Sequence, residues 1–206
     1  MQLLANTTSP FVRIARTAMI EKGIDIEPTL VDPWADDVRL RAANTATRVP
    51  TLVLDDGTPL AECLLIVQWL ELARPAPGWP SLVGQGAVVA GILSRTGVAI
   101  GAIEASTITI ITRKVTAPVL FDETPVGLRR RRSMAEGMQR LEAQAGAIAA
   151  SGTPLLDAIA AVTLYDYQQM RFGDQPWLPA TPRLKALAQA WNVRASFART
   201  KPYTPA

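Results

Sequence analysis

The sequence contains no histidine and a single cysteine, Cys63, among its 206 residues. The absence of histidine removes the usual general base, the Ser–His and Cys–His nucleophile pairs and the commonest metal ligand. A lone cysteine excludes an intrachain disulfide framework and leaves too few ligands for a structural zinc site. We therefore expect no bound metal and a reducing, cytoplasmic environment.

Long uncharged apolar runs and extended basic surfaces are also scarce. The most apolar long segment, residues 87–112, contains Arg95 and Glu104, so it is typical of a buried helix and predicts no membrane span. The N-terminus lacks a basic stretch followed by an apolar one, so no signal peptide is expected. Net charge is +3, and the basic run at residues 129–132 would encircle a helix. That arrangement favours a solvated helix turn over a nucleic-acid site.

The hydrophobic patterns divide the chain into an α/β part and an all-α part. The first part carries, in order, strand, helix, strand, helix, β-hairpin and helix, predicted at residues 2–6, 10–22, 24–31, 36–43, 51–61 and 62–73. Gly23 marks the end of the first helix, and Asp56-Gly57 marks the hairpin turn.

A segment rich in proline and glycine, residues 74–81, follows the last of these helices and is the best linker candidate. Beyond it the chain predicts helices at residues 86–112, 126–150, 155–172 and 183–199. We therefore predict an N-terminal α/β domain over residues 1–75, a linker over 76–83 and a helical bundle over 84–206.

Three short motifs carry the chemistry that the bulk composition leaves open. Thr8-Ser9-Pro10-Phe11-Val12-Arg13 places a hydroxyl at a helix N-terminus, where free backbone N–H groups and the helix dipole favour an anion. Arg48-Val49-Pro50-Thr51-Leu52 is a Val-Pro step that enters a strand, and Ala61-Glu62-Cys63 places a carboxylate at the start of another helix. Together these motifs suit a small acidic thiol peptide whose sulfur is kept ionised.

In these motifs the chain resembles the glutathione S-transferase family, and in particular bacterial members that begin with Thr-Ser-Pro-(Phe/Tyr)-Val-Arg. The resemblance runs nearly the whole length, down to Ser196–Pro202. It implies a thioredoxin-like N-terminal domain, a helical C-terminal domain, glutathione as co-substrate and a homodimer. At residues 9–12, where thioredoxins carry Cys-x-x-Cys, this chain has no cysteine.

Ser9 has two interpretations. As a catalytic residue it would donate a hydrogen bond to the glutathione thiolate, as the resemblance implies. As a structural residue it would cap the helix with Pro10 at the first helical position. The two roles compete for one hydroxyl, and on local sequence alone the cap is favoured.

The resemblance also implies a glutathione site built from Ser9, Phe11, Arg48, Val49, Pro50, Glu62 and Cys63. Val49-Pro50 would be a cis step that exposes backbone groups to the cysteinyl part of glutathione. Glu62 would face the γ-glutamyl ammonium group, and the Cys63 N–H its carboxylate. Serine is usual at the position of Cys63, so a good hydroxyl donor is replaced by a weak one. A mixed disulfide at Cys63 is the alternative reading.

The electrophile site is less clearly marked. Candidates by position are Phe11, Trp34, Glu104, Ile108, Ile111 and Arg113, of which Phe11 and Arg113 are selected. At Asp157 the family has a Ser/Thr-x-x-Asp capping box; here Pro154 takes the first position, so Thr153 is expected to cap.

The leading hypothesis is an enzyme that presents the glutathione thiolate to an apolar electrophile. The alternatives are a glutathione-dependent disulfide reductase or peroxidase, and a non-catalytic glutathione-binding protein on the same fold. The apolar helix at 86–112 supports a homodimer.

Overall fold

The computed structural model describes residues 1–118 and 120–203. Its contacts divide the chain into two compact units. One unit is residues 1–82 together with the segment from Arg194 onward, and the other is Val83–Val193. The sequence pattern gave no indication that the last residues group with the first 82.

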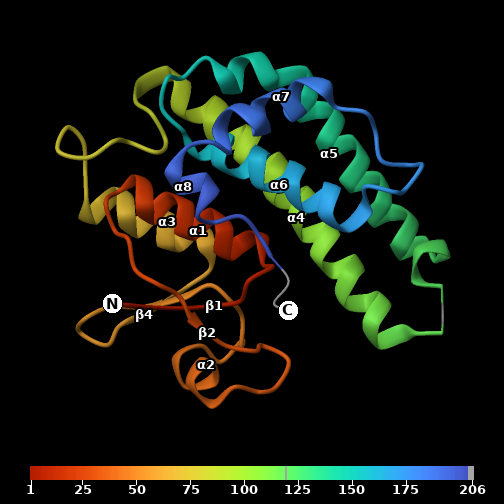
Figure 1. Cartoon of the computed structure of the whole chain (residues 1–206), viewed down its shortest axis with the longest axis horizontal. Helices are drawn as coiled ribbons and strands as arrows, with labels where there is room; N and C mark the ends of the chain where they lie inside the picture. Colours follow the sequence, from red (N-terminus) through yellow and green to blue (C-terminus); the bar gives the residue numbers. More distant parts are fainter. Residues whose placement is uncertain (119, 204–206) are drawn as a thin grey trace. The chain divides into compact units, whose positions relative to one another are not determined.

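The first unit is a four-stranded sheet with helices on both faces (Figure 1). Its elements are β1 (Gln2–Ala5), α1 (Pro10–Glu21), β2 (Thr29–Leu30), α2 (Val38–Ala43), β3 (Thr51–Val53), β4 (Pro59–Ala61), α3 (Cys63–Ala73) and α8 (Ala195–Ala198). The strand order is β2-β1-β3-β4, with β1 parallel to β2 and antiparallel to β3. Helices α1 and α3 pack together on one face, and α2 lies on the other. The α/β prediction for this part of the chain is confirmed.

Burial explains how these helices attach. The α1 sequence places Ile14, Ala15 and Ala18 on one side, and all three are fully buried. On the opposite face of the sheet, Leu40 of α2 packs against Leu4 of β1 and Val31. The sheet is therefore held between two apolar layers.

Two predicted elements differ in the structure, one within this unit and one that crosses the boundary between the two units. The strand expected at 24–31 is reduced to Thr29–Leu30. The residues before it form a loop in which Ile24 is buried and Asp25 and Glu27 are exposed. Both carboxylates pair with Arg199. The helix expected at 183–199 is broken into two.

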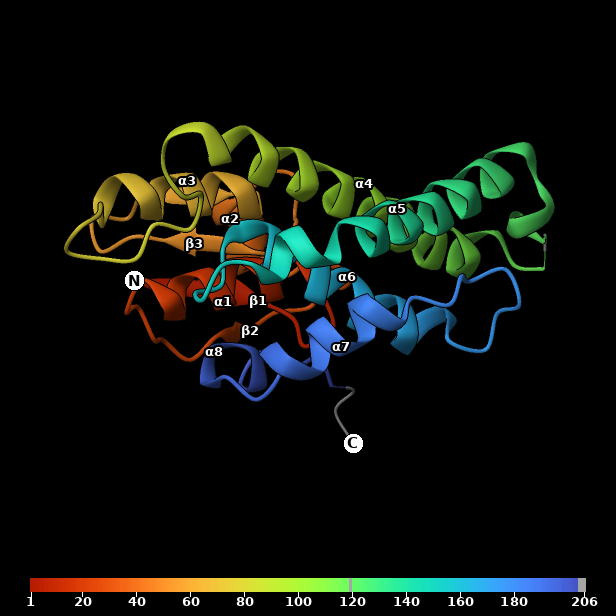
Figure 2. The same cartoon turned by 90° about the horizontal axis from the view of Figure 1, so that it is seen from above.

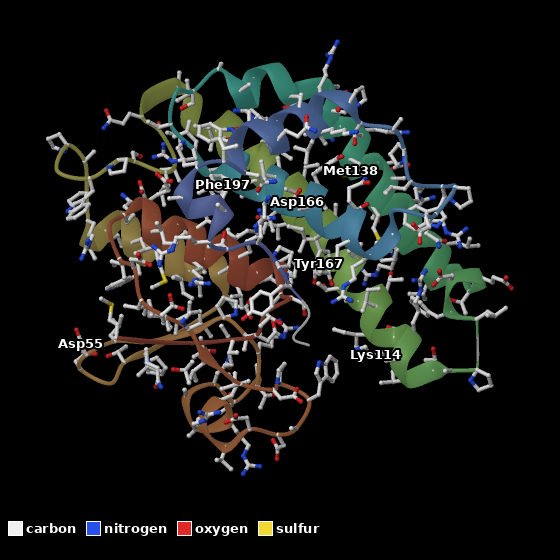
Figure 3. All side chains as sticks on the ribbon, viewed as in Figure 1. Asp55, Lys114, Met138, Asp166, Tyr167 and Phe197 are labelled. Carbon is white, nitrogen blue, oxygen red and sulfur yellow. The ribbon has the colours of Figure 1, made fainter. Side chains whose placement is uncertain are left out.

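The second unit is a helical bundle, as predicted (Figure 2). It contains η1 (Gly86–Val88), α4 (Val89–Thr116), η2 (Phe121–Glu123), α5 (Pro125–Ala149), α6 (Leu156–Phe172) and α7 (Pro182–Trp191). Helix α6 is its most buried element and contacts α4, α5 and α7. Helices α4 and α5 approach closely at Gly137, where a Cβ would lie 2.7 Å from the Cβ of Ala102. On α5, Met138 is fully buried (Figure 3).

The expected cap of α6 is wrong. The helix begins at Leu156 after Leu155, and no side chain caps it. Thr153 lies in the preceding turn, where its backbone carbonyl accepts from Ser151. Asp157 is almost fully buried and pairs with Arg95 of α4 at 2.7 Å, so its carboxylate links two helices. Burial raises the pKa of Asp157, and the Arg95 hydrogen bond opposes that rise.

One described helical segment, Gly86–Thr116, is long and apolar enough to cross a membrane by length and composition. Core helices of water-soluble proteins meet the same criterion. This one packs on α5 and α6, yet only 28% of its most apolar window is buried within the chain. The exposed large apolar side chains of α4 are Leu93, Ile111 and Val115.

Candidate functional site

The three sequence motifs meet at one end of the sheet of the first unit. In the β1–β3 pair, Leu4 lies opposite Thr51, and in the β3–β4 pair Thr51 lies opposite Ala61. The residues that leave β1 toward Ser9, those that enter β3, and those that leave β4 toward Glu62 are therefore neighbours. Segments up to about 50 residues apart in sequence form one candidate site.

Ser9 is the N-cap of α1, with Pro10 at the first helical position. Its Oγ accepts a hydrogen bond from the backbone N–H of Val12 at 3.3 Å, and its own N–H donates to Oδ1 of Asn6 at 2.9 Å. A hydroxyl has one donor and two acceptor sites, so capping uses an acceptor site and leaves the O–H free to donate. The cap is therefore observed, and it does not use the O–H that the thiolate role would need; that role stays a prediction.

The Val49-Pro50 peptide bond is cis, as expected from the resemblance. Pro50 is buried and Val49 is half-buried directly before β3. Among residues 1–118 and 120–203, no backbone N–H or C=O bonds to Val49. Its backbone groups are therefore available to a ligand in extended conformation.

Asn44 shapes the loop that leads to this step, and no sequence motif predicts this role. Its side-chain amide donates to the carbonyl of Arg48 at 3.1 Å and to Oγ1 of Thr51 at 3.0 Å. Thr51 also donates to the Arg48 carbonyl at 2.8 Å. The loop from Asn44 to Thr51 is thus fixed by a buried polar network, whose members can be recognised only once they are neighbours in space.

Glu62 has a left-handed backbone, with φ of 68° and ψ of 124°. A non-glycine residue held there costs about 1–3 kcal/mol, and such strain clusters at ligand sites. Its side chain is exposed and lies 3.3 Å from Nη1 of Arg48. Because both partners are exposed, this ion pair contributes little to stability. The carboxylate is available to a cationic ligand group.

Cys63 is the first residue of α3 and is 4% exposed. Burial raises the pKa of its thiol to about 12, and the charge of Glu62 adds to the rise. A thiol that is buried and protonated is a poor nucleophile, which argues against the mixed-disulfide reading. Its position in the first turn of α3 leaves its backbone N–H at a helix N-terminus, where the dipole favours a carboxylate.

The two electrophile-site candidates lie in different units. Phe11 is half-buried in the first turn of α1, two residues after Ser9. Arg113, near the end of α4, pairs with Asp122, and its guanidinium lies 5.2 Å from the ring of Phe172. The Asp122 hydrogen bond raises the pKa of Arg113. Phe11 follows Ser9 by two residues, and both Phe11 and Arg113 remain predictions for the electrophile site.

No set of three or more His, Cys, Asp or Glu side chains is arranged to hold a metal within the described part of the chain. The chemistry available at this end of the sheet is a hydroxyl donor, a helix N-terminus at each of α1 and α3, free backbone groups at Val49 and an exposed carboxylate.

Comparison with known proteins gives this arrangement a context. Residues 8–73 match the family model described as glutathione S-transferase, N-terminal domain. The chain is 27% identical over 203 residues to the "Uncharacterized GST-like protein YibF" of Escherichia coli (strain K12), and the match covers 98% of each chain.

Solved structures share the fold of this chain over nearly its full length. A glutathione S-transferase from Methylobacterium radiotolerans, in complex with glutathione sulfonate, is 28% identical with a TM-score of 0.86, covering 100% of this chain and 96% of that one. A second, from Methylobacillus flagellatus with glutathione bound, has the same fold, with a TM-score of 0.85 at 24% identity and coverage of 98% and 99%. Together with the match over residues 8–73, these similarities support the glutathione S-transferase family, with a thioredoxin-like N-terminal domain and a helical C-terminal domain.

Proposed function

We propose that this protein is a glutathione transferase that binds glutathione at the end of the sheet formed by Ser9, Val49-Pro50 and Glu62-Cys63. The convergence of these three segments carries the proposal, since each supplies a group that one part of glutathione needs. Glu62 would pair with the γ-glutamyl ammonium group, the Cys63 N–H with its carboxylate, and Val49 with the cysteinyl backbone. Arg48 lies beside Glu62 and would add a cation to the site.

The chemistry needs a thiolate. A free thiol has a pKa of about 8.5, and lowering that by ~2 units requires about 2.7 kcal/mol. A hydrogen bond from Ser9 to a charged sulfur contributes about 1.5–3 kcal/mol. The N-terminus of α1 adds about 0.3–1 kcal/mol. These two terms suffice without histidine or metal.

In the reaction, the proton of the glutathione thiol leaves to solvent and the thiolate attacks an apolar electrophile. A carbon–sulfur bond forms, and the bond to the leaving group, such as a halide, breaks with its electron pair. Phe11 is the nearest candidate contact for the electrophile. The enzyme contributes proximity and electrostatic stabilisation and forms no covalent intermediate.

A glutathione-affinity column followed by two assays tests the proposal. Retention together with turnover of an aryl halide supports it. Turnover only of a glutathionylated disulfide would favour a reductase, in which glutathione supplies both redox sulfurs because Cys63 is buried. Retention without turnover would favour a binding protein. Failure to be retained, with no measurable affinity for glutathione in solution, would refute all three.

We further propose a homodimer in the cytoplasm, where reducing conditions preserve the thiol. Apolar side chains stay exposed on α4 and on α3, namely Leu93, Ile111, Val115, Leu65 and Leu72. Surfaces of this kind mark association sites. Sedimentation at micromolar concentration should give about twice the chain mass of 22.2 kDa; a mass near one chain would exclude the dimer.

A further inference from the structure

The C-terminal segment is bound along helix α1, and its attachment begins at the end of that helix. The carboxylate of Glu21 accepts two hydrogen bonds from Arg194, at 2.6 and 2.7 Å, and a third from the hydroxyl of Ser196. Between these residues and the tail, Phe197 of α8 is fully buried (Figure 3). The segment is thus anchored by charge and by apolar burial.

The later contacts move toward the start of α1. Thr200 shares a buried hydrogen bond with Thr17 at 2.9 Å, and the Arg199 carbonyl accepts from Arg16 at 3.2 Å. Finally, the backbone N–H of Tyr203 donates to the carbonyl of Thr7 at 3.3 Å. The tail therefore runs the length of α1 and reaches the loop that carries Ser9.

The backbone of Tyr203 lies close to the segment that carries Ser9. Thr7 precedes Ser9 by two residues, and two peptide units span at most about 7.6 Å between Cα atoms. Tyr203 is 56% exposed, so packing in the core does not account for an aromatic residue at this position. An exposed aromatic residue whose backbone is held two residues from the candidate thiolate donor can offer a flat apolar surface with a polar edge.

We propose that Tyr203 is a specificity residue that forms one wall of the electrophile site and favours electrophiles with a planar aromatic group. This inference rests on the proposed function. Offset or edge-to-face contact between aromatic rings contributes to binding beyond the area buried, whereas a small aliphatic group gains little from the same ring. The selectivity would come from the tail, and the thiolate chemistry from Ser9.

The test measures binding, so it does not depend on turnover. Isothermal titration compares glutathione, S-methylglutathione and S-(2,4-dinitrophenyl)glutathione on the wild type, Tyr203→Ala and Tyr203→Phe. Tyr203→Ala should weaken the binding of the S-aryl conjugate by about five- to tenfold and leave the affinities for the other two ligands within about twofold of the wild type. Tyr203→Phe should keep the wild-type pattern, because the ring is retained.

Thr200→Val supplies a second perturbation away from the ring. It removes the buried hydrogen bond to Thr17 and loosens the tail, so it should reproduce the selective loss for the S-aryl conjugate. Equal losses for all three ligands in Tyr203→Ala, or no loss for any, would overturn the assignment of Tyr203 alone. A wild type that binds none of the ligands would overturn the proposed function and this inference together.

Discussion

Replacing Ser9 by alanine separates its role as the N-cap of α1 from its proposed role as the thiolate donor. The substitution removes the acceptor that caps α1 through Val12, at 3.3 Å, and also the O–H that would donate to the thiolate. Loss of the cap lowers stability by about 1 kcal/mol. For a chain of this size that corresponds to a fall in Tm of about 2–4 °C.

Loss of the donor acts on the bound ligand. Removing a hydrogen bond to a charged sulfur costs about 1.5–3 kcal/mol, which raises the pKa of the bound thiol by about one to two units. From a bound-thiol pKa of about 6.5, that rise leaves about three- to twenty-fivefold less thiolate at pH 7, so kcat should fall by about the same factor and the midpoint of the pH–rate profile should shift to higher pH. The dipole of α1 remains, so some ionisation at neutral pH should survive.

Ultraviolet absorbance of the bound thiolate, titrated against pH, measures this shift directly, with Tm recorded on the same samples. Ser9→Thr keeps the hydroxyl, so it should keep both the Tm and the pKa of the bound thiol near their wild-type values. Thr124→Ala is a matched control, since Thr124 caps α5 by accepting from the Gly127 N–H at 3.0 Å. Thr124→Ala should lower Tm without changing the pKa of the bound thiol. A Ser9→Ala curve that coincides with the wild type, alongside a lower Tm, would show Ser9 to be only a cap. The neighbouring Thr8 hydroxyl or a backbone N–H would then be the better candidate for the thiolate donor.

Three further predictions concern the neighbouring elements. Glu62→Gln should raise the KM for glutathione with kcat nearly unchanged, because it weakens a contact shared by ground and transition states; a collapsed kcat with constant KM would assign Glu62 another role. Cys63 should resist iodoacetamide at pH 8, where a pKa of about 12 leaves on the order of one thiol in ten thousand ionised, and should react once the protein is unfolded; equal rates would contradict its burial. Asp157→Ala should lower the free energy of unfolding by about 3 kcal/mol, or Tm by ~6–12 °C, because it leaves the Arg95 charge without its partner. If that unpaired charge is the cause, adding Arg95→Met to the same chain should recover part of the lost stability.

Elements specified by local chemistry could be predicted. The apolar run of β1, the Ser9-Pro10 start of α1 and the Asp56-Gly57 turn all lie where expected, and Gly57 has a φ of 84° that suits glycine. Each depends on neighbours within a few residues. Residue types at the candidate site were recognisable for the same reason, because its motifs are short and contiguous.

Features that depend on distant partners were not predictable. The 183–199 segment has a helical pattern, yet Arg194 and Ser196 bind Glu21, and the helix is interrupted between Trp191 and Ala195. In the same way, the part played by Asn44 depends on contacts that form only after folding. Periodicity records which face of a segment is buried, and it carries no information about which other segment covers it.

The return of the C-terminal segment to α1 has a consequence for how the protein is made. The contacts between Glu21 and Arg194 and between Thr17 and Thr200 join residues 173 and 183 positions apart. On the ribosome, the first 82 residues emerge long before their last partner does. The thioredoxin-like unit therefore stays incomplete while the whole helical unit is synthesised. During that time the surface of α1 that α8 later covers is open to solvent. Closure of such long loops is a slow step, so the part of the chain translated first is expected to be the last to be completed.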